Sequence, residues 1–154
     1  MLDLIVSLQL DYFGALFLMI AGLIIGLGAV TVIDIHGFLG RTSKYWTEAT
    51  TRTHKVTKPL IWLGIAMFSI GALVLYRGSY NHPIAQMQAI IVIILILNGL
   101  FLSFKVSPFL LEREKHNKDS KLLPKSWQRK ITLSFIVSFI GWWSLVLSFV
   151  ATLG

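Results

Sequence analysis

Residues 12–33 read YFGALFLMIAGLIIGLGAVTVI and contain no charged side chain. At 1.5 Å per helical residue, these 22 residues extend over roughly 33 Å, enough to cross a hydrocarbon core about 30 Å thick. An open strand is excluded, because lipid offers its backbone amides no hydrogen-bond partner. The stretch therefore predicts a membrane-spanning helix.

Three further apolar runs follow, so we expect four spans, at about residues 12–36, 58–77, 83–106 and 129–153. Thr57 and Pro59 suit the start of the second span, and His82 or Asn81 with Pro83 suits the start of the third. Short connections make neighbouring spans antiparallel. The predicted fold is an all-α, four-transmembrane-helix bundle that forms one membrane domain over residues 1–154.

The composition agrees with a membrane protein and narrows the function classes. Hydrophobic residues make up 55% of the chain and charged residues 14%, with a mean hydropathy of +0.74, which excludes an ordinary soluble domain. The absence of cysteine excludes disulfides and thiolate chemistry. We find no phosphate loop, zinc helix motif or nucleophile elbow, so no catalytic residue and no metal site is assigned.

The positive charges predict the topology. Thirteen of the 14 Lys and Arg residues lie in two of the connections, and only Arg77 lies on the other side. The thirteen are Arg41, Lys44, Arg52, Lys55, Lys58, Lys105, Arg113, Lys115, Lys118, Lys121, Lys125, Arg129 and Lys130. By the positive-inside rule, both basic connections face the cytoplasm and both termini lie outside, in a bacterial-type inner membrane. We expect these charges to contact anionic lipid headgroups, not nucleic acid.

Proline 108 follows the third span. If the helix continues through it, we expect a kink, because proline removes one backbone hydrogen bond. Alternatively the segment breaks there and lies in the membrane interface, where Phe109, Leu110 and Trp127 among basic residues would suit the headgroup level.

Small residues line one face of two spans. In the fourth span they include Ser134, Ser138 and Gly141, and in the first span Gly22 and Gly26. Such faces let helices approach closely. They serve either packing within the bundle or contact with a second copy or another membrane protein.

Asn98 is a polar residue deep in the third span. An amide at that depth usually bonds to a neighbouring helix, so we expect Asn98 to hold two helices of the bundle together.

Asp34 comes one residue after the first apolar run. It either reaches headgroup water or, if the first helix continues, faces the bundle as a proton acceptor, a counter-ion or the partner of a basic residue. His36 ends the first span and His54 precedes the second, so a hairpin could hold both at one depth. Two such imidazoles in an apolar cleft can ligate a b-type haem. Asp34, His36 and His54 are therefore the candidate cofactor-binding residues.

The order of short motifs resembles a loose superfamily of small bacterial membrane proteins. The motifs are GAVTVIDI at 28–35, TKPLIWLG at 57–64, LNGLF at 97–101 and VSP at 106–108. The superfamily contains copper-resistance-D-type and membrane protoporphyrinogen-oxidase-type proteins, and the resemblance implies a helical bundle with a haem or redox role. The haem-binding members carry a histidine within the first span, whereas residues 12–33 have none, so no axial ligand carries over.

The sequence therefore predicts an integral inner-membrane protein that binds haem or takes part in redox chemistry. The alternative is a non-enzymatic accessory subunit of a membrane complex, or a small transporter. Under either hypothesis we expect a homo-oligomer or a partner in a larger membrane assembly.

Overall fold

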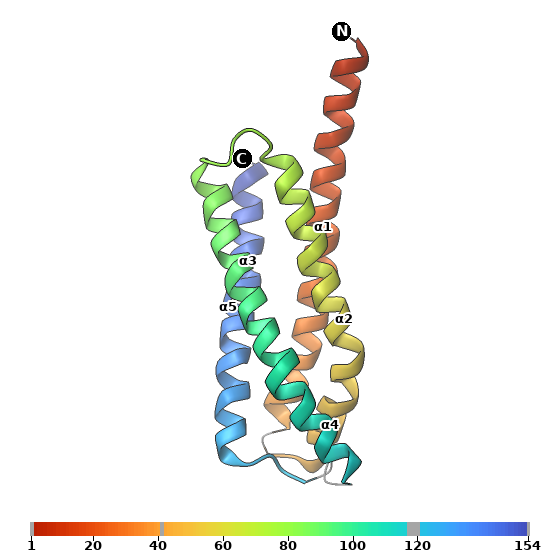
Figure 1. Ribbon diagram of the computed structural model, residues 1–154, viewed down its shortest axis with the longest axis vertical. Helices are drawn as coiled ribbons and strands as arrows, with labels where there is room; N and C mark the ends of the chain where they lie inside the picture. The colour runs from red at the N-terminus through yellow and green to blue at the C-terminus, as the bar shows by residue number, and fades with distance from the viewer. Residues whose placement is uncertain (1, 41, 117–120, 154) are drawn as a thin grey trace.

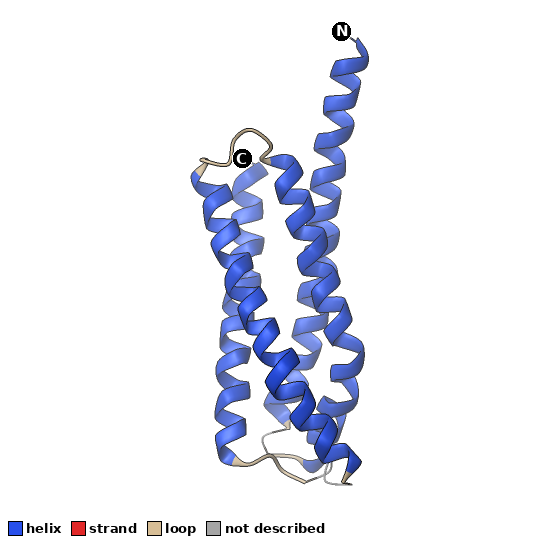
Figure 2. Ribbon diagram, in the orientation of Figure 1, coloured by secondary structure: helices blue, strands red, loops and turns tan. Residues whose placement is uncertain are grey.

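The computed structural model describes residues 2–40, 42–116 and 121–153, with side chains from Asp11 onward. This part of the chain is helical and contains no strand (Figures 1 and 2). The elements are α1 (Leu2–Leu39), α2 (Lys44–Leu75), α3 (Pro83–Phe101), the π-helical turn η1 (Leu102–Val106), α4 (Ser107–Lys115) and α5 (Lys125–Leu153).

The described residues contain four helical stretches that are long and apolar enough to cross a membrane. They are Asp11–Leu39, Lys44–Leu75, Pro83–Lys115 and Lys125–Leu153. The all-α four-helix fold predicted from the sequence is confirmed, and the chain is a multi-pass membrane protein. Both termini lie at one end of the bundle, and α1 extends beyond that end (Figure 1).

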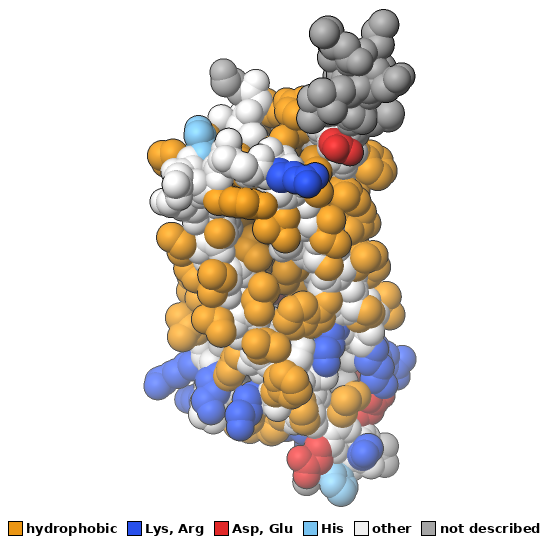
Figure 3. All heavy atoms as spheres, turned by 45° about the horizontal axis from the view of Figure 1, so that its top comes forward, with side chains coloured by type: hydrophobic (Ala, Val, Ile, Leu, Met, Phe, Trp, Pro, Cys, Tyr) orange, Lys and Arg blue, Asp and Glu red, His pale blue; other side chains and the backbone are white. Residues whose placement is uncertain are grey.

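The end opposite the termini carries the basic connections, and we call it the basic end. Figure 3 shows hydrophobic side chains over the middle of the visible face and most of its Lys and Arg side chains at the basic end. Arg41 and Lys118, which count in the charge asymmetry, lie outside the described residues.

The second helix begins earlier than the sequence predicted. The expected helix start at Thr57 and Pro59 is wrong, because α2 begins at Lys44 and carries Pro59 inside it. Ser43 caps the helix by accepting a hydrogen bond from the Trp46 amide. Four threonines of this segment are buried, and their hydroxyls bond to backbone carbonyls one turn earlier, which removes the cost of burying them. They are Thr47, Thr50, Thr51 and Thr57. Helix α2 therefore begins only five residues after the end of α1 at Leu39.

Helices α1 and α2 approach each other through glycines. A Cβ atom on Gly64 would lie 2.5 Å from the Cα atom of Gly26, and one on Gly22 would lie 2.6 Å from the Phe68 amide nitrogen. Nearer the termini, a Cβ on Gly71 would lie 2.6 Å from the Ala15 carbonyl oxygen. Because a side chain at any of these positions would collide with backbone, the glycines allow the two helices to pack at close range.

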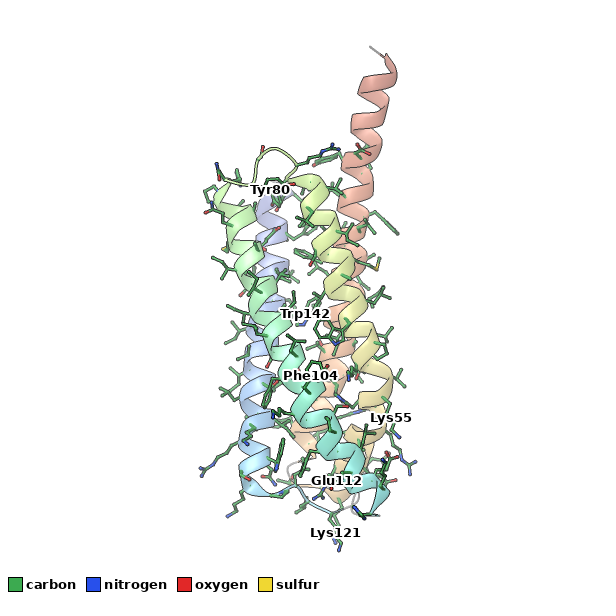
Figure 4. All side chains as sticks on the ribbon, viewed as in Figure 1. Lys55, Tyr80, Phe104, Glu112, Lys121 and Trp142 are labelled. Carbon is green, nitrogen blue, oxygen red and sulfur yellow. The ribbon has the colours of Figure 1, made fainter. Side chains whose placement is uncertain are left out.

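Helix α5 closes the bundle against both α1 and α3. Trp142, which is 1% exposed, inserts its ring toward Gly26 and lies in the interior of the bundle (Figure 4). It joins a core that includes Met19, Phe68 and Leu145. On the α3 side, Leu95 packs over Gly141.

Asn98 joins α3 to α5 through three hydrogen bonds. Its amide nitrogen donates to the Ser134 carbonyl oxygen at 3.1 Å and to the Ser138 hydroxyl at 3.0 Å. The Ser134 hydroxyl in turn donates to the Asn98 carbonyl oxygen at 2.7 Å. The small-residue faces of α1 and α5 are thus occupied by contacts within the chain.

The third span continues as a helix through Pro108. Immediately before it, residues Leu102–Val106 form a π-helical turn, and the Ser107 amide bonds to the Leu102 carbonyl oxygen. Proline cannot donate its own backbone hydrogen bond, and the wider turn accommodates this defect. Leu110 of α4 then joins Val106 and Leu123 in a second apolar cluster, and Trp127 and Ile131 of α5 pack against it. The break considered from the sequence does not occur.

We expect Gly22→Ala to lower the stability of the folded protein, because its methyl group would collide with the α2 backbone. Overpacking of this kind costs about 1–3 kcal/mol. The control is Gly28→Ala on the same helix, where an added Cβ meets nothing within 4 Å. Thermal unfolding in detergent measures both variants. Equal melting temperatures for the two would contradict close α1–α2 packing.

We expect Asn98→Leu to cost about 1–2 kcal/mol, because its bonds to α5 are lost inside the bilayer. A double-mutant cycle with Ser138→Ala tests the specific contact. If Asn98 and Ser138 interact, the double variant loses less stability than the sum of the two single variants. Strictly additive losses would show that the hydrogen bond contributes nothing.

Candidate functional site

A cavity of about 70 Å³ lies between all four spans toward the basic end. That volume is large enough to hold water. Its apolar walls include Ile61, Trp62, Leu102 and Phe135. Seven polar side chains also line it, namely Asp34, Thr50, His54, Lys58, Ser103, Thr132 and Ser134. We call this the polar cavity.

Each of the four spans contributes to the polar cavity. Asp34 and Gly37, three residues apart, lie on one face of α1, and His54 and Lys58, four apart, lie on one face of α2. The η1 turn supplies Ser103, and α5 supplies Thr132. Polar groups therefore converge from elements that are distant in sequence.

Two polar atoms at this site are buried without a hydrogen-bond partner in the described part of the chain. They are the Asp34 Oδ2 atom and the His54 Nε2 atom. Lys58 lines the same cavity, yet no ion pair joins it to Asp34 among the described residues. Buried polar atoms are nearly always bonded, so a water molecule or a small ligand in the cavity is the partner we expect for these two atoms.

The structure brings Asp34 and His54 to the same cavity but places His36 elsewhere. The His36 Nδ1 atom lies 3.1 Å from the Thr53 hydroxyl, and its ring packs against Trp46 with centroids 5.1 Å apart. His36 is not among the residues that line the polar cavity.

These residues do not fit a haem held between His36 and His54. One imidazole is engaged with Thr53 and Trp46, and the other faces a cavity of about 70 Å³. Pockets for cofactor-sized ligands usually measure several hundred Å³. Among the described residues, no group of three His, Asp or Glu side chains is placed to hold a metal ion.

The π-helical turn shapes the α3 side of the cavity. The Trp62 indole nitrogen donates a hydrogen bond of 3.3 Å to the Ser103 hydroxyl, and a Cβ on Gly99 would lie 3.2 Å from the Trp62 ring. The Ser103 hydroxyl keeps its own hydrogen to donate. π-Helical turns are frequent at functional sites, because they re-aim side chains without ending the helix.

Sequence reasoning missed Lys58, Ser103 and Thr132 as cavity residues. Lys58 could have been predicted as a cavity residue, because in a helix that begins at Lys44 it lies one turn after His54, on the same face. Ser103 could not have been predicted, because the π-helical turn changes the direction of its side chain, and the periodicity of the sequence does not show this turn.

A second polar contact lies near the termini. The Gln88 amide nitrogen donates to the Thr152 hydroxyl at 3.3 Å, and the Tyr76 hydroxyl lies 3.1 Å from the same oxygen atom. Gln88 is 1% exposed, and its Oε1 atom has no partner in the described residues. This cluster ties α2 and α3 to the last turn of α5.

The fold and the polar cavity define a multi-pass helical membrane protein with ionisable side chains inside the bundle. Comparisons of the chain with protein-family models, with curated proteins and with solved structures find no match. The resemblance to the copper-resistance-D-type superfamily stays a prediction.

We expect Ser103→Cys to react with a hydrophilic thiol reagent, because the side chain faces a polar cavity large enough for water. Ser138→Cys should not react, since Ser138 is 6% exposed and bonds to Asn98. The chain has no cysteine of its own, so labelling reports these positions without background. Mass spectrometry of the protein labelled in membranes measures the difference. Equal labelling of the two variants would contradict the cavity.

Proposed function

We propose that the chain is a small inner-membrane transporter whose polar cavity takes up and releases a proton through Asp34 and His54. The observation that carries this proposal is the pair of unpartnered buried atoms, Asp34 Oδ2 and His54 Nε2, at one cavity inside the bundle. Ionisable residues within membrane spans are costly and commonly serve proton relays and ion pathways.

The chemistry requires no cofactor. When protonated Asp34 gives its proton to the neutral His54 ring, directly or through water, a carboxylate and an imidazolium result. The imidazolium then returns the proton to water on the side to which the cavity opens, and the Asp34 carboxylate takes up the next proton from the opposite side, which closes the cycle. Lys58 lies one turn from His54, so its positive charge opposes the imidazolium and favours this release.

The orientation of the chain in the membrane follows from the distribution of its Lys and Arg residues. The basic end carries nearly all of the Lys and Arg residues, so we assign it to the cytoplasm and the termini to the outside. The polar cavity would then exchange protons with the cytoplasm, and the Gln88–Thr152 cluster would lie toward the outside.

The small-transporter hypothesis is favoured over the accessory-subunit hypothesis by the packing. Gly22, Gly26, Ser138 and Gly141 contact other helices of this chain, so these faces are not available for a partner. A homo-oligomer formed through other surfaces stays a prediction.

Proton flux into liposomes tests the proposal directly. Purified protein is reconstituted with a trapped pH-sensitive dye, and a potential is imposed with potassium and valinomycin. We expect the wild type to carry protons faster than empty liposomes and Asp34→Asn or His54→Gln to be slower by at least about tenfold, because each removes a proton-exchanging group. His36→Gln is the matched control and should stay near wild type.

Two results would overturn the proposal. The first is a wild-type flux equal to that of empty liposomes, and the second is equal loss in the His36 and His54 variants. A Soret band that shifts on reduction with dithionite, and that His36→Gln removes, would instead support the haem hypothesis.

A further inference from the structure

A second hollow lies on the outer surface of α5 at the basic end. It measures about 570 Å³ and lies between the turn that follows α1 and the first turns of α5. Thr42, Lys125, Gln128, Arg129 and Thr132 form its polar part, and Leu133 and Ile136 form its apolar part. We call it the α5 hollow. It is separate from Asp34 and His54, which do not line it.

The α5 residues of the hollow are arranged along one helical face. Lys125, Arg129 and Thr132 follow one another at steps of four and three residues, and Leu133 and Ile136 continue the same stripe toward the middle of the span. At 1.5 Å per residue, the stripe from Lys125 to Ile136 extends over roughly 16 Å. The hollow therefore changes from basic to apolar along the membrane normal.

The two cations of the hollow are not neutralised by the protein. Both side chains are exposed, and neither makes an ion pair with a described acidic residue. In the described part of the chain, the carboxylates that do make ion pairs are Glu48 and Glu114, which bind Arg52 and Lys55. Two unpaired cations, with the hydroxyls of Thr42 and Thr132 beside them, suit a phosphate group.

The apolar part of the α5 hollow indicates whether a free phosphate or a phospholipid fits. Leu133 is 64% exposed and Ile136 is 44% exposed, and both lie within the membrane-spanning stretch. An acyl chain attached to the phosphate would lie along this part of α5, whereas a free phosphate would leave it uncovered. Basic pockets between spans at the headgroup level bind anionic lipid headgroups.

We propose that the α5 hollow is a binding site for one anionic phospholipid. Lys125 and Arg129 hold its phosphate, and one acyl chain runs along Leu133 and Ile136. The site selects the lipid by charge, because a zwitterionic headgroup brings its own cation beside Lys125 and Arg129.

Native mass spectrometry tests the site. The full chain in mild detergent is incubated with equal amounts of phosphatidylglycerol and phosphatidylcholine. We expect one phosphatidylglycerol to be retained preferentially, and Lys125→Gln with Arg129→Gln to reduce its retention by about tenfold or more. Lys121→Gln with Lys130→Gln is the matched control, since it removes two cations near the same helix start that do not line the hollow. The control should retain the lipid.

Two further experiments distinguish a bound lipid from free phosphate, and the second uses only the wild type, so that misfolding of a variant does not affect it. Inorganic phosphate in large excess should not displace the lipid, and displacement would show that the site holds free phosphate. In the wild type, an anionic lipid with a photoreactive acyl chain should label the peptide containing Leu133 and Ile136. Equal loss of retention in both double variants, or labelling spread over all four spans, would overturn the proposal.

Discussion

The close approach of α1 and α2 is the constraint on which the rest of the structure depends. Gly26 and Gly64 bring the two backbones together, and Gly22 and Gly71 continue this contact along the hairpin. The register that results places His36 beside Thr53 and sets Asp34 at the same cavity as His54. It also leaves Gly26 open to Trp142, whose ring occupies the space between α1 and α5. Without these glycines the helices would separate, and neither the tryptophan nor the cavity would keep its place.

Most buried polar side chains of the described residues form hydrogen bonds within their own helix or with the neighbouring helix. The few that do not are therefore informative. The buried threonines of α2 bond to carbonyls one turn earlier, and Asn98 is matched by Ser134 and Ser138. Lipid offers no substitute for a missing partner, so an unmatched group inside a span costs more than it would at a soluble surface. Asp34 and His54 each leave one buried atom unmatched at the same cavity, and the proposed proton exchange is built on that pair.

Sequence reasoning predicted the fold well and the site in part, for physical reasons. Span number follows from hydropathy, which needs no knowledge of neighbours, and the His82 cap before Pro83 is read from local chemistry. The start of α2 at Lys44 was missed because its polar residues resemble a loop until their contacts with α1 are known. His36 and His54 were grouped by depth alone. Depth does not fix direction, because each step along a helix turns the side chain by about 100°.

The polar cavity and the α5 hollow share one wall. Thr132 lines both, because its position on α5 lies between the face that meets the bundle and the face that meets lipid. The two sites nevertheless rest on different charges. Asp34 and His54 lie within the bundle and do not line the hollow, whereas Lys125 and Arg129 lie on the surface and do not line the cavity. Because the charge-bearing residues are disjoint, each site can be removed while the other is kept.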